Sequence, residues 1–455
     1  MGAKARGAVD SVAGEVKVAG KLTYVHGEWP ETQMEAIRAC RFEQLSKFLV
    51  LFKRRHKCVV SQGGVILFDN VDKNLNGKVC TAFALYGLNE LGDESSAALE
   101  VLRPVLVFTL VAHAGKEAEK NGDDRSISTI FFGGGTPSIL PAQLFVKIMC
   151  VVREAFSVSE DAEITVECNP GTLTADKLRA YRSMGVNRLS IGLQSPDNRE
   201  LRALGRIHTY EQFEESYYAA RDAGFDNINI DIMSAIPYQT VTGYQSNLEK
   251  IAKLNPEHIS AYSLIVEEGT PLFDMVERSG GDILPTEDED RQMYALTKKI
   301  LADAGYHRYE ISNYARPGFE CRHNASYWER TDYIGFGVAA ASLLKKSESY
   351  PQSRRFTNTS DLESYIKNPI DNHSEEELLT QKDEMEEFMF LGLRMMAGIS
   401  TESFKEVFGR DFYEVYGDIA ANQMKQGLIK REGGRIRLTD MGIDVSNTVM
   451  AEYML

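Results

Sequence analysis

Residues 126–138, SISTIFFGGGTPS, place three glycines and a threonine directly after a short apolar segment. Residues 127–132 are rich in β-formers, which predicts a buried strand that stops at Gly133. Because glycine lacks a Cβ atom, the backbone of Gly134 and Gly135 can approach a ligand closely and adopt a positive φ. Their N–H groups and the Thr136 hydroxyl could then bind a carboxylate or an amino group. The alternative is a tight strand-to-helix turn that binds nothing, because a glycine run alone is weak evidence.

Polar side chains recur near the ends of the later predicted strands. They are Glu167, Asn169, Gln194, Arg206, Asp231, Ser260 and Tyr262. Asp231 interrupts the apolar run INIDIM, where a buried carboxylate needs a partner. Taken alone, each has an ordinary structural explanation, such as a helix cap for Asp231 or a surface ion pair for Arg206. Together, at successive strand ends, they predict a polar site for a small molecule.

The elements that would position these residues alternate regularly from Ser126 onward. The pattern predicts strands over residues 127–132, 164–168, 188–191, 227–233, 258–264 and 309–312. It predicts helices over residues 140–156, 174–184, 210–223, 243–254 and 288–304, with Thr174 and Thr209 as N-caps. Repeated βα units indicate a parallel sheet with helices outside. Their number and even spacing favour a full or partial barrel, in which chemistry lies at the strand C-termini.

Composition and charge limit the function classes. A chain of 455 residues, 43% hydrophobic and 26% charged, predicts more than one globular domain. A net charge of −15 argues against general binding to nucleic acid or to anionic membranes. The longest mostly apolar run, residues 105–114, is too short to span a bilayer, and we find no signal peptide. We therefore expect a cytoplasmic protein without a transmembrane segment.

The two ends of the chain are less informative. Residues 1–107 show no coherent period, although residues 43–52 could form a helix and residues 63–68 a strand. The basic cluster at residues 53–57 is better explained as a solvated surface than as a phosphate site. This N-terminal segment stays unassigned.

The C-terminal part of the chain has a clearer pattern. Residues 346–380 include a stretch rich in Ser, Asn and Pro and are predicted to be a linker. Helices at residues 380–396, 401–408 and 411–426 then precede a hairpin at residues 428–438, whose tip is Gly433–Gly434. This order predicts a small winged-helix-like domain over residues 381–455. The acidic chain favours packing or partner docking there over DNA binding.

Six motifs carry a family resemblance. In chain order they are GGGTPS, ECNPGTL, GVNRLSIGLQS, DIMSAIPYQT, HISAYSLIVEEGTPL and HNASYW. From about residue 115 to the C-terminus the chain resembles the radical S-adenosylmethionine (SAM) proteins of the oxygen-independent coproporphyrinogen III oxidase family, most closely its HemW-type heme chaperones. The resemblance implies an α/β fold, with a partial TIM-like (β/α) radical SAM barrel over residues 108–345. It further implies that Gly134, Gly135 and Thr136 hold the methionine end of SAM, and that Glu167, Gln194, Arg206 and Asp231 complete its site.

The resemblance also implies a 4Fe–4S cluster, but the ligand motif is missing. The family carries CxxxCxxC just after its first strand, and three thiolates at that spacing can wrap one cluster. The six cysteines here are Cys40, Cys58, Cys80, Cys150, Cys168 and Cys321, and no two form even a CxxC pair. We expect the first strand and its cysteine loop to be replaced. Either cluster chemistry has been lost, or the upstream reading frame is chimaeric, shifted or misassigned.

Residues 323–328, HNASYW, match the HNxxYW motif that this branch is associated with for heme. Imidazole is a common axial ligand of heme iron, and aromatic neighbours can cover a porphyrin face. The resemblance thus implies His323 as the heme-iron ligand, with Tyr327 and Trp328 beside the porphyrin. The alternative is a core turn in which His323 only bonds the backbone. Cys321 could supply a thiolate, although a single cysteine is more often inert.

The implied function is a heme-binding chaperone that transfers heme to acceptor proteins, with respiratory proteins among the candidates. One alternative is a radical SAM enzyme that oxidatively decarboxylates coproporphyrinogen III. Another is an inactive family member with a replaced or misassigned N-terminus. The enzyme needs a reduced cluster to cleave SAM, so the missing CxxxCxxC motif argues against catalysis and leaves the enzyme assignment open.

Overall fold

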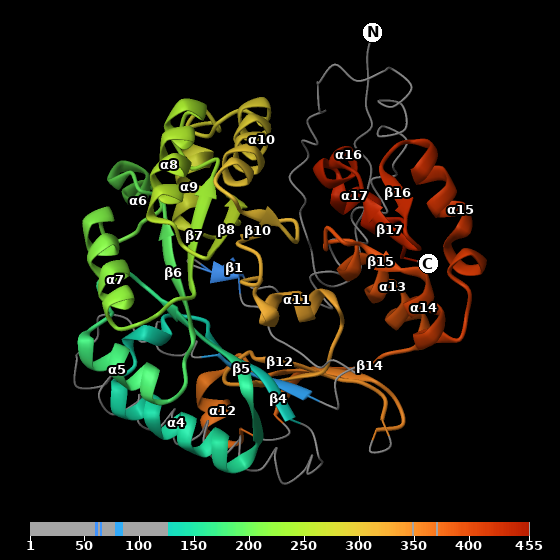
Figure 1. Ribbon diagram of the computed structural model, residues 1–455, viewed down its shortest axis with the longest axis horizontal. Helices are drawn as coiled ribbons and strands as arrows, with labels where there is room; N and C mark the ends of the chain where they lie inside the picture. Colours follow the sequence, from blue (N-terminus) through green and yellow to red (C-terminus); the bar gives the residue numbers. More distant parts are fainter. Residues whose placement is uncertain are drawn as a thin grey trace.

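One twelve-stranded sheet organises the molecule (Figure 1). The computed structural model describes residues 60–61, 64–65, 78–84, 126–347, 350–369 and 372–454. The centre of the sheet is a run of adjacent parallel strands: β3 (Lys78–Ala84), β4 (Ser126–Gly133), β5 (Ser157–Cys168), β6 (Arg188–Gln194), β7 (Ile228–Ser234) and β8 (His258–Ser263). This curled parallel sheet is the half-barrel of the radical SAM fold, so the predicted partial barrel is confirmed.

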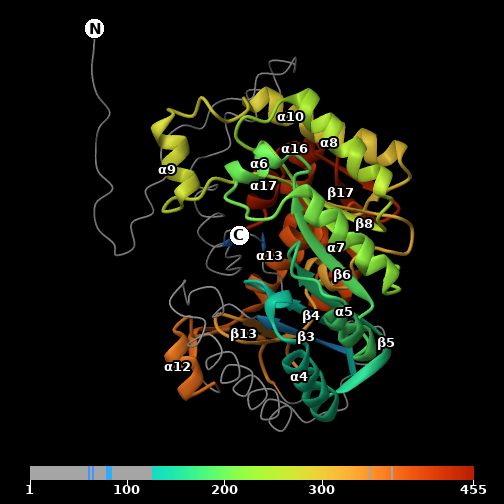
Figure 2. The same ribbon diagram turned by 90° about the vertical axis from the view of Figure 1, so that its left-hand side faces the viewer.

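Helices cover the outer face of the half-barrel (Figures 1 and 2). They are α4 (Ala142–Ala155), α5 (Ala175–Ser183), α6 (Asn198–Ala203), α7 (Tyr210–Asp222), α8 (Val241–Leu254), α9 (Pro271–Arg278) and α10 (Glu287–Asp303), with a 3-10 turn, η2 (Pro137–Ile139), after β4. The predicted N-caps are confirmed. Thr174 accepts a hydrogen bond from the Lys177 N–H, and Thr209 forms a capping box with Gln212. Within the described residues, no helix combines the length and apolar character that a membrane crossing requires.

Further strands, mostly antiparallel, extend both edges of the parallel core. On one side β8 pairs with β10 (Asn313–Ala315), and β9 (His307–Arg308) follows. On the other side β11 (Tyr333–Phe336) lies parallel to β3 and is followed by β12 (Ala341–Leu344), β13 (Arg354–Asn358) and β14 (His373–Leu378). Two short helices accompany these strands, α11 (Arg322–Trp328) and α12 (Leu362–Lys367).

Two expectations need correction. The strand predicted at residues 309–312 is wrong, because these residues connect β9 to β10. Residues 346–380 are not a plain linker, since they contain β13, α12 and β14 and continue the sheet. The position of a first barrel strand, beside β4, is occupied by β3, which pairs in parallel with both β4 and β11.

Few residues of the N-terminal segment are described. The predicted strand at residues 63–68 is represented by β2 (Gly64–Val65), which pairs with β1 (Val60–Ser61). The predicted helix at residues 43–52 and the basic cluster at residues 53–57 lie outside the described residues.

The C-terminal part forms its own core of helices and a small sheet. Its elements are α13 (Gln381–Gly392), β15 (Ile399–Ser400), α14 (Thr401–Phe408), α15 (Phe412–Lys425), β16 (Ile429–Glu432), β17 (Arg435–Leu438), α16 (Asp440–Asp444) and α17 (Ser446–Ala451). Gly433 and Gly434 form the hairpin tip with φ values of 58° and 76°, which glycine adopts without steric cost. Three helices followed by a hairpin agree with the predicted winged-helix-like arrangement.

A buried ion-pair cluster joins this domain to the sheet. Glu387 of α13 is fully buried and bonds Arg330 (Nε–Oε2 2.9 Å) and Arg355 of β13 (NH1–Oε1 2.7 Å). Arg330 follows α11 closely in the chain, so the cluster also fixes the far end of that helix. Removing one partner from such a cluster would leave buried charge uncompensated, at a typical cost of about 3–5 kcal/mol.

Candidate functional site

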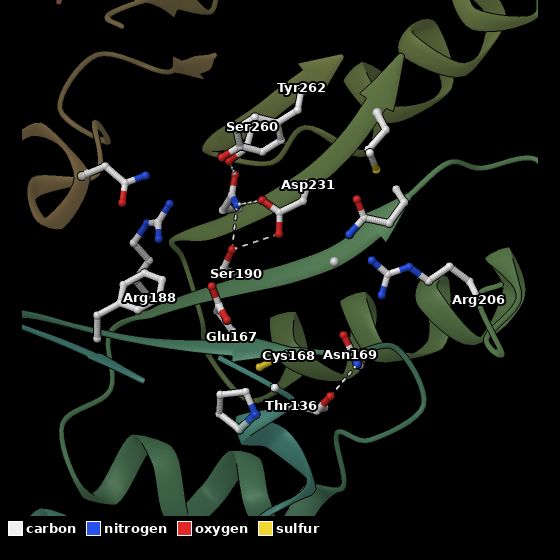
Figure 3. A pocket seen from close by; sticks show the side chains of 18 of the residues that line it. Thr136, Glu167, Cys168, Asn169, Arg188, Ser190, Arg206, Asp231, Ser260 and Tyr262 are labelled. Atoms are coloured by element: carbon white, nitrogen blue, oxygen red, sulfur yellow. Dashed lines mark hydrogen bonds between the residues drawn. The ribbon is translucent and has the colours of Figure 1, made fainter. Parts of the chain in front are cut away.

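A polar pocket opens at the carboxyl ends of β4 to β8 (Figure 3). Its empty volume, with the open mouth included, is about 1160 Å³. The structure brings together the predicted residues Gly135, Thr136, Glu167, Gln194, Arg206 and Asp231, and also Asn169, Ser260 and Tyr262. The strand-end pattern in the sequence therefore predicted most of the polar lining correctly.

The glycine turn forms one wall of the pocket. Gly134 and Gly135 have φ values of 79° and 58°, so the expectation of a left-handed backbone is confirmed. The Gly134 N–H is not available to a ligand, because it donates to Glu167 Oε2 at 3.1 Å. The Thr136 hydroxyl accepts a hydrogen bond from Asn169 Nδ2 at 3.0 Å, which still leaves its own proton to donate.

Two carboxylates give the pocket its chemical character. Burial, reinforced by the charge of Asp231, raises the pKa of Glu167 to about 8, against the opposing effects of the Gly134 N–H and Arg188. Burial also raises the pKa of Asp231, although hydrogen bonds from Asn229, Ser260 and Ser190 and the charge of Arg188 oppose it. Both acids therefore hold a proton more readily than exposed carboxyls. A ligand cation would favour their ionised forms, so the pair suits an ammonium or sulfonium group.

Arg206 and Gln194 complete the opposite wall. Burial lowers the pKa of Arg206, and the nearby Asp231 carboxylate partly offsets this effect. Figure 3 shows the Arg206 guanidinium pointing toward the pocket from the side opposite Arg188. Gln194 ends β6 with a φ of 72°, and the pairing of β6 with β7 shifts register between Gly192 and Gln194. Such strained backbone in a non-glycine residue is typical of a functional site.

The sequence reasoning missed five polar lining residues: Arg188, Ser190, Asn229, Ser263 and Asn324. Arg188 is 2% exposed and begins β6, where it was counted only as the start of a strand. Asn229 stands two residues before Asp231 on the same face of β7 and donates to Asp231 Oδ1 at 2.8 Å. Two sequence signals could have identified two of these residues. Arg188 is a charged residue at the start of an apolar strand, and Asn229 is an amide two residues before a carboxylate that needs a buried partner.

The proposed heme residues His323, Tyr327 and Trp328 lie on α11 and are not part of the pocket lining, although Asn324 of the same helix is. His323 is fully buried, its Nδ1 atom is 3.0 Å from Thr129 Oγ1, and its ring stacks on Phe131 at a centroid distance of 4.4 Å. Tyr327 packs edge-on against His323, with the ring centroids 6.1 Å apart. Trp328 is 7% exposed and packs into the C-terminal core. His323 therefore packs within the core of this structure.

The described cysteines do not suit a 4Fe–4S cluster. Cys321 is fully buried, and burial raises the pKa of its thiol to about 12. Burial raises the pKa of Cys168 further still, and Cys150 is exposed on α4. Among the residues that the structure describes, no three His, Cys, Asp or Glu side chains gather as a metal site. The described part of the chain therefore does not fit the cluster that the family carries.

Comparison with known proteins gives two family matches. The radical SAM superfamily model matches residues 106–251, and the HemN C-terminal domain model matches residues 379–445. The heme chaperone HemW of Lactococcus lactis is 37% identical over 330 residues, which is 72% of this chain and 85% of the relative. HemW of Bacillus subtilis is 33% identical over 332 residues, which is 72% of this chain and 86% of that relative. A third relative is the mitochondrial radical S-adenosyl methionine domain-containing protein 1 of zebrafish (Danio rerio). It is 33% identical over 70% of this chain and 72% of that relative.

Among solved structures, coproporphyrinogen III oxidase (HemN) of Escherichia coli superposes with a TM-score of 0.69. The superposition covers 83% of this chain and 90% of HemN, at 21% sequence identity. Identity at this level supports a shared fold and no more.

Proposed function

The chain belongs to the HemW heme chaperone family of radical SAM proteins, and from this membership we propose that it binds heme and delivers it to acceptor proteins. The observation that carries the proposal is the 37% identity to a heme chaperone over 330 residues, which is 85% of that relative. The acceptor class, respiratory or other, is open to experiment.

We propose further that the pocket binds SAM. The Glu167 carboxylate would receive the amino group of the methionine end, beside Gly134, Gly135 and Thr136. Arg206 would pair with its carboxylate, and Gln194 and Asp231 would complete the site. The two buried acids support this assignment, because a positively charged ligand relieves their mutual repulsion. In the family the cluster supplies the electron that cleaves SAM. The residues described here do not fit that group, and we propose binding without cleavage.

SAM affinity is expected to fall at least tenfold in Asp231→Ala and to depend on pH in the wild type. The pKa of Glu167 in the ligand-free protein is about 8, so below that pH a bound ammonium must displace a proton. Affinity should therefore rise from about pH 6 to about pH 7, by no more than about tenfold per unit for one proton. Isothermal calorimetry measures both effects, and Glu167→Gln serves as the variant in which the slope disappears. Equal binding by wild type and Asp231→Ala, or a flat pH profile, would contradict the assignment.

Heme titration tests the chaperone function. We expect a spectral break at about one heme per chain and transfer of the bound heme to an apo-acceptor protein. A specific site saturates, whereas heme adsorbed to exposed apolar surface does not. Free heme at the same concentration is the control for the rate of transfer. The absence of a break at one equivalent, or transfer no faster from the protein than from free heme, would contradict the proposal.

A further inference from the structure

A buried hydrogen-bonded chain runs from the pocket to α11. Asp231 Oδ1 accepts from Asn229 Nδ2 at 2.8 Å, and Asn229 Oδ1 lies 2.6 Å from His258 Nδ1. His258 Nε2 lies 2.9 Å from the Tyr309 hydroxyl, which accepts from the backbone N–H of Cys321 at 3.3 Å. Asp231 lines the pocket, and Cys321 is the N-cap of α11. The chain therefore links the proposed SAM site to the helix that carries His323.

The direction of each bond in this chain follows from its two ends. The Asn229 amide donates to Asp231 and to Ser190 Oγ, so its carbonyl oxygen faces His258. His258 Nδ1 must then carry a proton and donate to it, which leaves Nε2 of a neutral ring as the acceptor for the Tyr309 hydroxyl. Tyr309 in turn accepts from Cys321. Every donor thus points toward Asp231, and a change at one end alters the partner of each group in turn.

The inner members of this chain are buried, whereas Asp231 at its pocket end is only partly buried. His258 and Cys321 are 0% exposed, Asn229 is 2% exposed and Tyr309 is 7% exposed. A broken link between inner members therefore leaves a buried polar group unsatisfied, which is energetically costly. Loss of one bond therefore affects the neighbouring groups of the chain, which is the physical basis for transmission between two sites.

We propose that the pocket and α11 are thermodynamically coupled through this chain. A group bound at Asp231 holds the carboxylate in place and so keeps α11 docked with His323 buried. Conversely, movement of α11 that exposes His323 to heme breaks the Cys321–Tyr309 bond and weakens binding at Asp231. The coupling is reciprocal, so SAM and heme should each lower the affinity for the other. This inference rests on the proposed function, because it names the regulation of the same two sites.

Hydrogen exchange on the full-length, ligand-free protein tests the coupling without either ligand. Asp231→Asn alters the pocket end of the chain, and Tyr309→Phe removes its fourth member while keeping the ring. Both should speed exchange of the α11 amides, such as that of Ala325, at least about fivefold, the lower end of typical coupling factors. Acceleration by Asp231→Asn matters most, because that residue lies in the pocket and not on α11.

Two matched controls separate coupling from general loosening. Tyr314→Phe removes another buried tyrosine hydroxyl, one that has no hydrogen-bond partner among the described residues. Glu167→Gln replaces the second pocket carboxyl with an amide of similar shape; Glu167 accepts from the Gly134 N–H and is not a member of the chain. Neither should change α11 exchange by as much as twofold. An α11 exchange rate in Asp231→Asn equal to that of the wild type, or equal acceleration in all four variants, would overturn the proposal.

The heme affinity of the same variants separates a failure of the proposed coupling from a failure of the proposed heme-chaperone function. Asp231→Asn and Tyr309→Phe should bind heme at least about threefold more tightly than Tyr314→Phe, since α11 is released more easily. If wild-type protein does not bind heme at all, the proposed chaperone function fails, whereas the exchange experiment still decides the coupling. If heme binds but all variants match the wild type, the coupling fails and the function stands.

Discussion

Anaerobic reconstitution with iron and sulfide is expected to leave this protein without a stoichiometric 4Fe–4S cluster. The reason is the number and spacing of its cysteines. Cys40, Cys58 and Cys80 are 18 and 22 residues apart in the sequence, far from the CxxxCxxC spacing that wraps one cluster. Cys80 lies within β3, paired with Thr129 and Tyr333, and not in a loop after the strand. Cys321 and Cys168 hold their protons, as their raised pKa values indicate.

The measurement is iron and sulfide content per chain, together with the broad visible absorption of thiolate-ligated iron. We expect far less than the about four irons per chain that a filled cluster would give. A HemW relative that carries the cysteine motif, reconstituted in parallel, is the control for the procedure. About four irons per chain in this protein would show that ligands come from an unforeseen set of residues. Loss of that iron in Cys80→Ser would then identify one of them.

Replacing His323 with alanine is expected to shift or abolish the Soret band of the heme complex. If α11 moves to expose the ring, His323 becomes an axial ligand, and its loss removes a bond to iron. The substitution also removes the stack on Phe131 and leaves the buried Thr129 hydroxyl with one partner fewer, so some loss of stability is expected. Far-UV circular dichroism must therefore accompany the heme titration. A His323→Ala spectrum identical to the wild type, at equal affinity, would remove His323 from the site.

Thr129→Val provides the matched comparison. It removes the hydroxyl that lies 3.0 Å from His323 Nδ1 while keeping the imidazole and a side chain of similar volume. If burial of His323 opposes ligation, this variant should retain the wild-type Soret position and bind heme at least as tightly. Cys321→Ala should leave the band position unchanged, because the raised pKa of this buried thiol disfavours thiolate ligation.

The sequence predicted the barrel well where its pattern repeats. The α7 helix was expected at residues 210–223 with Thr209 as its cap, and it spans Tyr210–Asp222 with a full capping box. Such segments carry both a period and an end signal, so local information suffices. The polar strand ends were predictable for the same reason, because parallel strands bring their carboxyl ends to one edge of the sheet.

The failures share a different cause, since they depend on long-range pairing. β14, HSEEEL, has a charged and mostly exposed pattern that is typical of a solvated segment, yet its backbone pairs with β13 as an edge strand. β3 lies in a segment without any period, and its neighbours β4 and β11 come later in the chain. The burial of His323 depends on Phe131 and Thr129, almost 200 residues earlier, so no local motif could reveal it.

The pairing of β3 with β11 has a consequence for how the chain folds during synthesis. Cys80 lies opposite Tyr333, so more than 250 residues must leave the ribosome before the register between these two strands can form. Until then β3 presents an unpaired edge, and such edges invite contacts with other chains. A topology with so many non-local contacts is expected to fold slowly, on the scale of milliseconds to seconds or longer. Slower translation or a holdase chaperone should accordingly raise the soluble yield of this protein. The gain should be larger than for a shortened version that begins after β3 and so lacks that strand.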